Sequence, residues 1–250
     1  MSYRTGPKIV TDGLVLCLDA GDRNSYAGSG STWYDLSGNG NNGTLINGVD
    51  YSNANKGSLV LDGASDYISL ASFDDDSNNE LSVFFWVNLS QENYYLAEDL
   101  YMNWIVNKRD NGSDRQWQLL TVRDPNNLNI IIPNATIFDG PNTIGSTAYN
   151  GSPSYQMNLG TWHYVGFTTS GINNGFLRTY LDGNLNTYTT LTGNRKKGSR
   201  PLIIGTTAWS LGAGILEWIG KIANGKIYNR ALSNDEITQN YNATKGRFGL

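Results

Sequence analysis

"LRTYLDGNLNTYTTL", residues 177–191, joins two runs of aliphatic, aromatic and β-branched residues through Asp182–Gly183. Asp-Gly and Asn-Gly pairs accept a positive φ and favour tight turns whose twist matches that of two paired strands. The stretch therefore predicts a β-hairpin. Such pairs recur along the whole chain, at 12–13, 39–40, 42–43, 47–48, 62–63, 111–112, 139–140, 150–151, 174–175 and 224–225.

Short strand-like runs lie between these turns. Residues 13–20, GLVLCLDA, are apolar on both alternating faces, which is typical of an inner strand. Residues 80–90, ELSVFFWVNLS, alternate between one face with Leu81, Val83, Phe85 and Val87 and another with Phe84 and Trp86. Strands recur at intervals of ~8–15 residues without a helical period, which favours an all-β antiparallel sandwich or barrel. Residues 90–103 and 133–160 are expected to be long irregular loops.

One helix is predicted, at the end of the chain. Ser233 is the expected N-cap, and Glu236 three residues later completes a capping box. Gly246 is the expected stop, because glycine accepts the left-handed conformation that commonly ends a helix. Lys245 and Arg247 lie where the helix dipole is negative, which favours cations.

The totals limit the functional classes. The chain has 250 residues, a formal net charge of −4 and a charged fraction of 16%, without a basic stripe. The single cysteine, Cys17, excludes a disulfide framework within one chain and is expected to pack as a small hydrophobic residue. The densest basic run, GNRKKGSR at 193–200, is expected to be an exposed loop, and one loop does not make a nucleic-acid-binding surface.

The start of the chain does not have the form of a secretory signal. Residues 1–13, MSYRTGPKIVTDG, lack the apolar core of about 7–15 residues that such a signal carries. The longest apolar runs, LVLCL and VFFWV, are much shorter than the ~18 residues of a membrane span. We therefore expect a protein that is made in the cytoplasm and does not insert into a membrane. Residues 1–12 are interpreted as an N-terminal arm and residues 13–250 as one domain.

Taken in order, seven segments resemble the laminin-G-like branch of the concanavalin A-like lectin/glucanase superfamily. They are WYDLSGNGNNGTL (33–45), SLVLDGASDYISL (58–70), LSVFFWVN (81–88), TWHYVGFTTSG (161–171), LRTYLDGNL (177–185), PLIIG (201–205) and GKIANGKIYNRALSNDEITQNYNA (220–243). The combined order carries the resemblance, and no single segment does. It implies an antiparallel two-sheet jelly-roll sandwich, to which the sequence adds one short C-terminal helix.

Residues 11–45 resemble, more narrowly, the form found in virion proteins of tailed bacteriophages, especially phages of marine bacteria. This resemblance implies a non-enzymatic structural component of a phage particle: a capsid decoration protein, a head fibre or a tail-associated protein. The expected location is the virion, and the expected partners are other virion proteins or further copies of the chain. The alternative hypothesis is a carbohydrate-binding module that attaches particles to host-surface glycans. A glycan hydrolase is the third.

Hydrolases of this superfamily carry three acids spaced Glu-x-Asp-x-Glu on one strand, where alternation points them into the same cleft. This sequence has no such strand. The run Asp74–Asp76 is consecutive, and Glu217 is isolated although it begins an apolar strand. His163, the only histidine, has no partner visible in the sequence and is expected to be structural or solvent-facing. No catalytic residue is assigned, and the chain is not expected to be an enzyme.

A calcium site is the one metal site that the resemblance suggests, since laminin-G-like domains often hold calcium at a loop rim through carboxylates and carbonyls. The candidate donors are Asp62, Asp66 and the run at 74–76. The interpretation we favour is that Asp62 shapes the turn with Gly63, Asp66 caps a loop, and residues 74–76 form a solvated acidic tip. No metal or other cofactor is assigned.

Exposed aromatic faces beside amides or carboxylates are what sugar binding uses. The candidate glycan contacts are Trp33, Tyr34 and Trp104. Tyrosine-rich loops are frequent at protein interfaces. The candidate interface residues are Tyr94, Tyr95 and Tyr101.

Residues 31–51, STWYDLSGNGNNGTLINGVDY, hold a dense cluster of Asn and Gly. Phosphate binding is not expected, because the glycines lack the Walker A order and no lysine follows them. We expect the cluster to turn the chain, with Trp33 and Leu36 anchoring the loop and the amides satisfying its own backbone.

Overall fold

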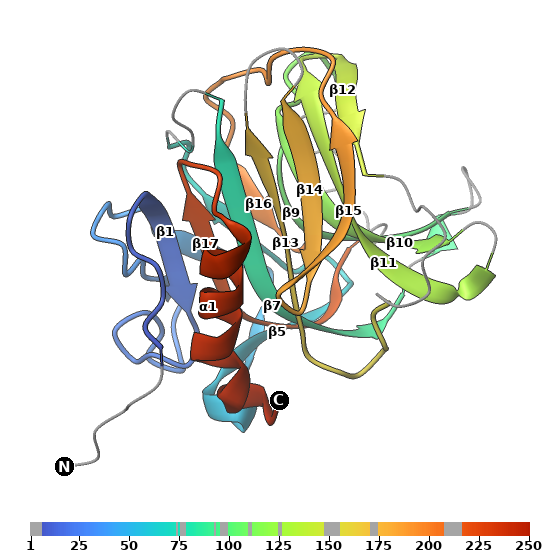
Figure 1. Cartoon of the computed structure of the whole chain (residues 1–250). Coiled ribbons are helices and arrows are strands. Elements are labelled where there is room, and N and C mark those ends of the chain that lie inside the picture. Colours follow the sequence, from blue (N-terminus) through green and yellow to red (C-terminus); the bar gives the residue numbers. More distant parts are fainter. Residues whose placement is uncertain are drawn as a thin grey trace.

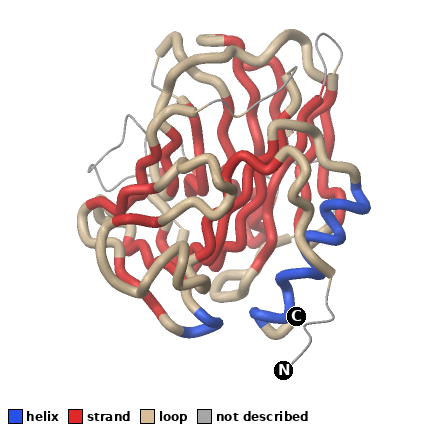
Figure 2. The backbone as a smooth tube through the Cα atoms, turned by 90° about the vertical axis from the view of Figure 1, so that its left-hand side faces the viewer, coloured by secondary structure: helices blue, strands red, loops and turns tan. Residues whose placement is uncertain are grey.

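The computed structural model describes residues 7–73, 75, 79–92, 94–95, 100–109, 112–124, 127–147, 156–170, 175–207 and 217–250. Two antiparallel sheets lie face to face in a jelly-roll sandwich, which confirms the predicted fold class (Figure 1). Strands distant in sequence are neighbours in both sheets, as the hydrogen-bonded order shows. Figure 2 shows that the helical segments lie at the periphery of the strand layers.

The first sheet has eight described strands. In order they are β15 (Asn184–Thr190), β14 (Phe176–Leu181), β13 (His163–Ser170), β7 (Leu81–Gln91), β17 (Ile219–Tyr228), β5 (Ser58–Asp62) and β4 (Asp50–Ser52), and β1 (Leu14–Asp19) also pairs with β17. The hairpin β14–β15 turns at Asp182–Gly183, where φ is 51° and 82°. The hairpin predicted at 177–191 is therefore confirmed.

The second sheet has nine described strands. In order they are β12 (Asn142–Ser146), β11 (Asn127–Asp139), β10 (Trp117–Asp124), β9 (Leu100–Lys108), β16 (Leu202–Ile204), β6 (Tyr67–Leu70), β3 (Gly43–Ile46) and β2 (Thr32–Trp33), and β8 (Tyr94–Tyr95) pairs with β9. The predicted irregular loop at 133–160 is wrong in its first part, because β11 continues to Asp139 and β12 follows. Its apolar residues Ala135 and Ile137 alternate toward the core despite the Pro- and Asn-rich composition.

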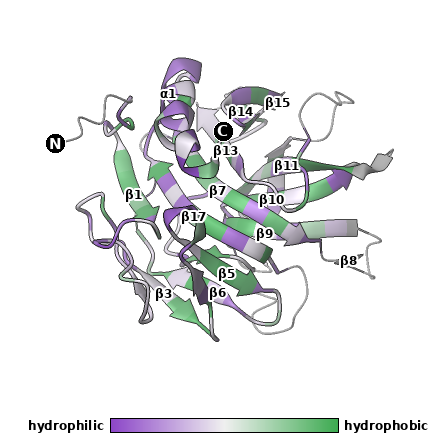
Figure 3. Cartoon of the chain, turned by 90° about the horizontal axis from the view of Figure 1, so that it is seen from below, coloured by the Kyte–Doolittle hydropathy of each residue, from purple (hydrophilic) through white to green (hydrophobic). Residues whose placement is uncertain are grey.

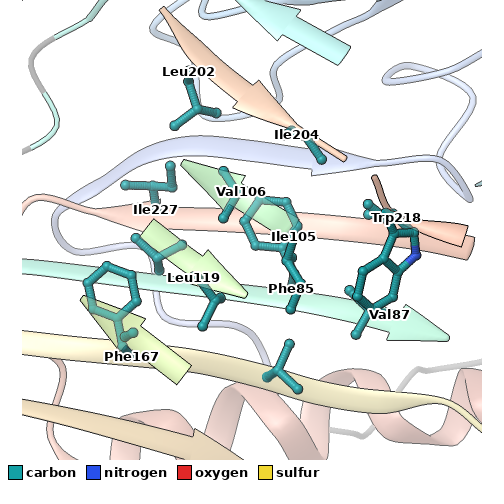
Figure 4. Packing of buried hydrophobic residues seen from close by; sticks show 14 of the residues in the cluster. Phe85, Val87, Ile105, Val106, Leu119, Phe167, Leu202, Ile204, Trp218 and Ile227 are labelled. Atoms are coloured by element: carbon teal, nitrogen blue, oxygen red, sulfur yellow. The ribbon is translucent and has the colours of Figure 1, made fainter. Parts of the chain in front are cut away.

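The main core lies between the two sheets, and β7 runs through its centre. Leu81, Val83, Phe85 and Val87 of β7 all belong to this core, as their alternation predicted. Figure 4 shows Phe85 and Val87 beside Ile105, Val106 and Leu119 from the second sheet and Trp218 and Ile227 near β17. The opposite face of β7 carries Phe84 and Trp86, which form a second buried cluster with residues of the C-terminal helix.

Two glycines make room for the aromatic rings of β7. Gly166 on β13 is paired with Phe84, and Gly225 on β17 is paired with Phe85. A Cβ atom added to Gly166 would lie 2.2 Å from Phe84 Cδ1 and 2.3 Å from the carbonyl oxygen of Val83. A side chain at either position would overlap the ring on β7, so only glycine fits there.

The C-terminal helix α1 (Asn234–Thr244) covers the outer face of the first sheet. The predicted capping box is confirmed: Ser233 Oγ accepts from Glu236 N, and the Glu236 carboxylate accepts from Ser233 N. Arg230 also donates two hydrogen bonds to Glu236, at 2.9 and 2.6 Å, and this pairing lowers the pKa of Glu236 to about 2. Figure 3 colours α1 mainly as hydrophilic and β1 and β5 mainly as hydrophobic.

The prediction that the helix stops at Gly246 is wrong: the α-helical part ends at Thr244. A 3₁₀ turn, η2 (Lys245–Phe248), follows directly, and Gly249 takes the left-handed conformation at φ 80°. Arg247 serves as a clamp, since it binds Asp19 and the backbone oxygens of Asn55 and Gly57. Asn55 belongs to η1 (Ala54–Lys56). None of the helices in the described residues combines the length and the apolar character needed to cross a membrane.

The predicted arm, residues 1–12, is partly placed. Residues 1–6 lie outside the described residues. Val10 N donates to Asn240 Oδ1 at 2.8 Å, Tyr228 donates to Val10 O at 3.1 Å, and Gln239 donates to Lys8 O at 2.7 Å. The segment around Lys8 and Val10 is thus attached to α1 and β17.

We predict that Gly166→Ala destabilises the chain by about 2–3 kcal/mol, because the new methyl group overlaps backbone and ring atoms that have no room to move. Gly246→Ala is the control, since a Cβ there meets nothing within 4 Å, and it should be neutral or slightly stabilising. Urea unfolding followed by tryptophan fluorescence measures both. Equal midpoints for the two variants would contradict the packing argument.

Candidate functional site

A pocket opens where β6 and β9 end and where β10 and β16 begin. Its volume is about 380 Å³, and it is lined by Ser72, Phe73, Asp75, Lys108, Gln116, Lys197, Gly198 and Ser199. Four separate stretches of chain supply these residues, so the pocket exists only in the folded sandwich. In Figure 1 the loop that precedes β16 runs, in orange, across the top of the molecule.

A buried ionic cluster centred on Asp75 forms one wall of the pocket. Asp75 Oδ2 accepts from Trp117 Nε1 at 2.8 Å and lies 3.4 Å from Lys108 Nζ. The two terminal nitrogens of Arg195 lie 3.3 Å from Asp75 Oδ1. The three charged side chains are at most 5% exposed. Because a buried charge that loses its partner is strongly destabilising, this cluster holds the three segments in one arrangement.

Lys108 is placed by the register of the second sheet. It is the last residue of β9 and pairs with Trp117, whose ring packs edge-on against Phe167 in the core at 5.7 Å between centroids. The Lys108 ammonium donates to the Phe73 carbonyl at 2.7 Å and lies 5.3 Å from the centroid of the Phe73 ring. The end of β9 therefore places a positive charge in the wall of the pocket.

The rim of the pocket is held by a second group of charges. Arg200 donates to Asp114 at 2.7 Å, and Lys196 lies 3.7 Å from the same carboxylate. Gln116, beside them, is 1% exposed, and its Nε2 atom has no hydrogen-bond partner among the described residues. The pocket thus combines fixed charges with a buried amide donor that lacks an acceptor.

Two expectations about these segments are wrong in part. Residues 74–76 were expected to form a solvated acidic tip, yet Asp75 is 3% exposed; Asp74 and Asp76 lie outside the described residues. The basic run at 193–200 is a loop, but Arg195 within it is 4% exposed. The signal that the sequence analysis missed is Lys108. It lies at the end of an apolar strand, and a lysine that is buried there requires an acidic partner.

The other acids singled out in the sequence have structural contacts. Asp62 accepts from Ala64 N at 2.7 Å and so shapes the predicted turn. Burial, together with the nearby charge of Asp62, raises the pKa of Asp66 to about 6. Glu217 is fully buried and accepts from Ser65 N at 2.6 Å. Within the described residues, no three His, Cys, Asp or Glu side chains converge as metal ligands, and calcium binding stays an untested alternative.

The Asn/Gly cluster at 31–51 is organised by Asp35. Its carboxylate accepts from Cys17 N at 2.8 Å, Ser37 N at 2.9 Å and Asn41 N at 3.0 Å. Asn41 Nδ2 donates to Val15 O at 2.9 Å, so the loop is fastened along β1. Its architectural role is as predicted.

The aromatic residues of the predicted glycan contact do not form one surface. Trp33 is 0% exposed because β2 places it in the inter-sheet core. Trp104 is 2% exposed and packs against Leu120 on the other side of the second sheet. The predictions that Trp33 and Trp104 contact a glycan are therefore wrong, since a buried ring offers no face to a sugar. Tyr34 is 52% exposed and stays a prediction. Leu36 is 38% exposed, so it does not anchor the loop as expected.

The predicted tyrosine interface lies at β8 and the start of β9. Tyr94 pairs with Tyr101 through the backbone, and the side chains of Tyr94 and Tyr95 lie outside the described residues. The Tyr101 ring is half-buried and lies 4.1 Å from the guanidinium of Arg123. Arg123 is itself paired with Glu92 at 2.6 Å. A role of these tyrosines in binding a protein stays a prediction.

His163 has a carboxylate partner that the sequence did not reveal. Its Nδ1 lies 2.8 Å from Asp182, and its Nε2 lies 2.8 Å from Thr161 Oγ1, which is the order of a hydrolase triad. However, Nε2 already accepts from Asn158 N at 3.1 Å, and Thr161 Oγ1 donates to Asn158 O at 2.8 Å. The single lone pair of Nε2 is therefore occupied. We interpret the contacts among Asp182, His163 and Thr161 as ones that stabilise the turn at Asn158.

The two-sheet jelly roll with a polar pocket at the end of its strands defines a lectin-like β-sandwich domain. Residues 62–238 match the family model Laminin_G_3, described as the concanavalin A-like lectin/glucanases superfamily, and the chain belongs to this superfamily. The narrower resemblance to phage virion proteins stays a prediction. A search of curated protein sequences found no match.

Solved structures with the same fold include domain 4 of AbnA, a GH43 extracellular arabinanase from Geobacillus stearothermophilus, in complex with arabinotriose. Its identity is 19% and its TM-score 0.59, over 91% of this chain and 98% of that one. The binding domain of Paraclostridial Mosquitocidal Protein 1 has 19% identity and a TM-score of 0.61, over 93% and 52%. Trypanosoma rangeli sialidase, in complex with the inhibitor DANA, has 14% identity and a TM-score of 0.60, over 97% and 34%. The present chain thus spans about half of the mosquitocidal binding domain and a third of the sialidase. These similarities establish the fold.

We predict that Asp75→Asn destabilises the chain by about 3–5 kcal/mol, because it leaves two buried cations beside a neutral amide. Asp12→Asn is the matched control: its carboxylate also pairs with an arginine, Arg230, but is 85% exposed, so the change should stay within about 0.5 kcal/mol. Chemical denaturation of both variants provides the measurement. A loss for Asp75→Asn no larger than for Asp12→Asn would show that the cluster does not hold the pocket.

Proposed function

We propose that this chain is a non-catalytic, lectin-like module of a bacteriophage particle that binds a glycan in the pocket at the end of its sandwich. The observation that carries this proposal is the pocket itself, whose polar groups are held by the buried cluster around Asp75. Fixed hydrogen-bonding groups suit a hydroxyl-rich ligand, because little ordering remains to be done on binding. The Phe73 ring adds an apolar wall.

The relatives support a glycan as the ligand class. Membership of the lectin/glucanase superfamily favours it, and domain 4 of AbnA was solved with arabinotriose. A non-catalytic role is supported by the contacts of the described acids. Asp75, Asp182 and Glu217 each hold a charged, ring or backbone partner that fixes local structure. Each of them is thus accounted for without a reaction.

The virion location is supported by the resemblance of residues 11–45 to phage virion proteins. In the structure this stretch forms β1, β2, most of β3 and the loop fastened by Asp35, so it is part of the sandwich. Partners on the particle would be other virion proteins or further copies of the chain. Residues 1–6 precede the segment that Asn240 and Gln239 attach to the domain, which makes them candidates for a docking arm.

We predict that the purified chain binds glycans on an array with micromolar to millimolar affinity and releases no reducing sugar from them. Ser199→Trp should abolish binding, because Ser199 lines the pocket and the indole would fill it. Ser29→Trp, the same change at an exposed site outside the lining, should bind normally. Failure of every glycan to bind, or reducing-sugar release that Glu217→Gln abolishes, would overturn the proposal.

We also predict that peptides of this chain occur in gradient-purified particles of the phage that encodes it, detected by mass spectrometry. Deletion of residues 2–6 tests the arm and leaves Lys8 and Val10 in place. The truncated chain should fold with unchanged stability and be lost from particles. Absence of the full-length chain from particles would refute the virion location, and normal incorporation of the truncated chain would refute the arm alone.

A further inference from the structure

We infer that the pocket receives an anionic group of the ligand, so that the chain recognises acidic glycans bearing carboxylates or sulfate esters. This inference rests on the proposed function, because it names the ligand class for the same pocket. It depends on three features: the signs of the lining charges, the direction of the hydrogen bonds already made, and the donor that lacks an acceptor.

The lining is richer in positive than in negative charge among the described residues. Lys108 and Lys197 line the pocket together with one acid, Asp75. That acid accepts a hydrogen bond from Trp117 and is paired with both Arg195 and Lys108. Its single negative charge is thus shared by two buried cations. Among the described lining residues, the positive side chains outnumber the negative ones by two to one.

The hydrogen-bonding groups of the lining are mostly donors. Gln116 Nε2 is a buried donor without an acceptor in the described residues, and a group of this kind gains a full hydrogen bond when a ligand oxygen reaches it. Ser72 and Ser199 add two rotatable hydroxyl groups. Carboxylates and sulfates offer several acceptor lone pairs and no donor, which matches this set better than a neutral sugar does.

The loop beside the pocket extends the positive character to its entrance. Residues 195–200 carry four cations, Arg195, Lys196, Lys197 and Arg200, of which the second and fourth contact Asp114. Lys197 is exposed at the rim. An excess of one sign of charge at a cleft concentrates ligands of the opposite sign and speeds their arrival. The volume, about 380 Å³, is at the small end of ligand sites and suits a single charged sugar residue.

The test compares ligands that differ only in charge, with the full chain in a calorimeter. One pair is tetragalacturonate and its methyl ester; the other is a sulfated carrageenan tetrasaccharide and its desulfated form. We expect each acidic member to bind at least about tenfold more tightly than its neutral partner. Its affinity should fall as salt rises from about 20 to about 300 mM. The two pairs also reveal whether the carboxylate or the sulfate is preferred.

Variants assign the effect to the pocket. Lys197→Gln and Gln116→Leu should each weaken acidic binding about fivefold or more, since each removes a donor at the anionic group. Lys56→Gln, the same change of charge on an exposed lysine of η1, should leave it unchanged. Thermal unfolding of each variant verifies that the fold is kept.

The outcomes separate the two proposals. Equal binding of acidic and neutral members would overturn the present inference and leave the glycan-binding function standing. Absence of binding to all four ligands and to a glycan array would overturn both. Acidic binding that neither pocket variant weakens would place the anion elsewhere on the surface and refute the assignment to this pocket.

Discussion

Strand β7 must bury both of its faces, and much of the fold follows from this constraint. Its inner face, with Phe85 and Val87, fills the space between the sheets. Its outer face, with Phe84 and Trp86, would expose two large rings if nothing covered it. Helix α1 and the segment at Val10 supply the cover, which is why this segment and the C-terminal helix meet on one side of the same sheet. Burial of aromatic side chains is among the largest favourable contributions that a single residue makes.

The ends of the sandwich are held by a different kind of interaction. Carboxylates organise several of the described loops. Asp35 gathers the backbone of the Asn/Gly loop, Asp182 binds His163, and Asp75 joins two cations from distant segments. Hydrogen bonds and ion pairs are directional, so they fix side chains at stated positions more narrowly than apolar contacts do. The pocket lies at such an end, where directional hydrogen bonds and ion pairs contribute more to the arrangement than buried apolar area does.

The regular parts of this structure could be predicted, because their signals are local. The alternation along β7, the capping box at Ser233 and the turn at Asp182 are each contained in a few neighbouring residues. The pocket could not be predicted, because Asp75 and Arg195 are 120 residues apart and meet only when the sheets form. The burial of Trp33 and Trp104 was missed for a related reason: composition identifies aromatic residues, but only the register of a strand decides which face they take.

The ionic cluster is also unusual on energetic grounds, and this bears on function. A buried ion pair is often no more stabilising than well-packed apolar residues of the same volume, because each charge loses its hydration. Replacing Asp75, Lys108 and Arg195 together by apolar side chains would therefore cost the sandwich little, while their present arrangement makes it dependent on all three. What an apolar wall would not provide is a lysine ammonium held at 3.4 Å from its counter-ion beside a cavity. The cluster is better understood as the support of the pocket, which is the proposed binding site, than as a device for stability, and Asp75 is the residue that pairs with both buried cations.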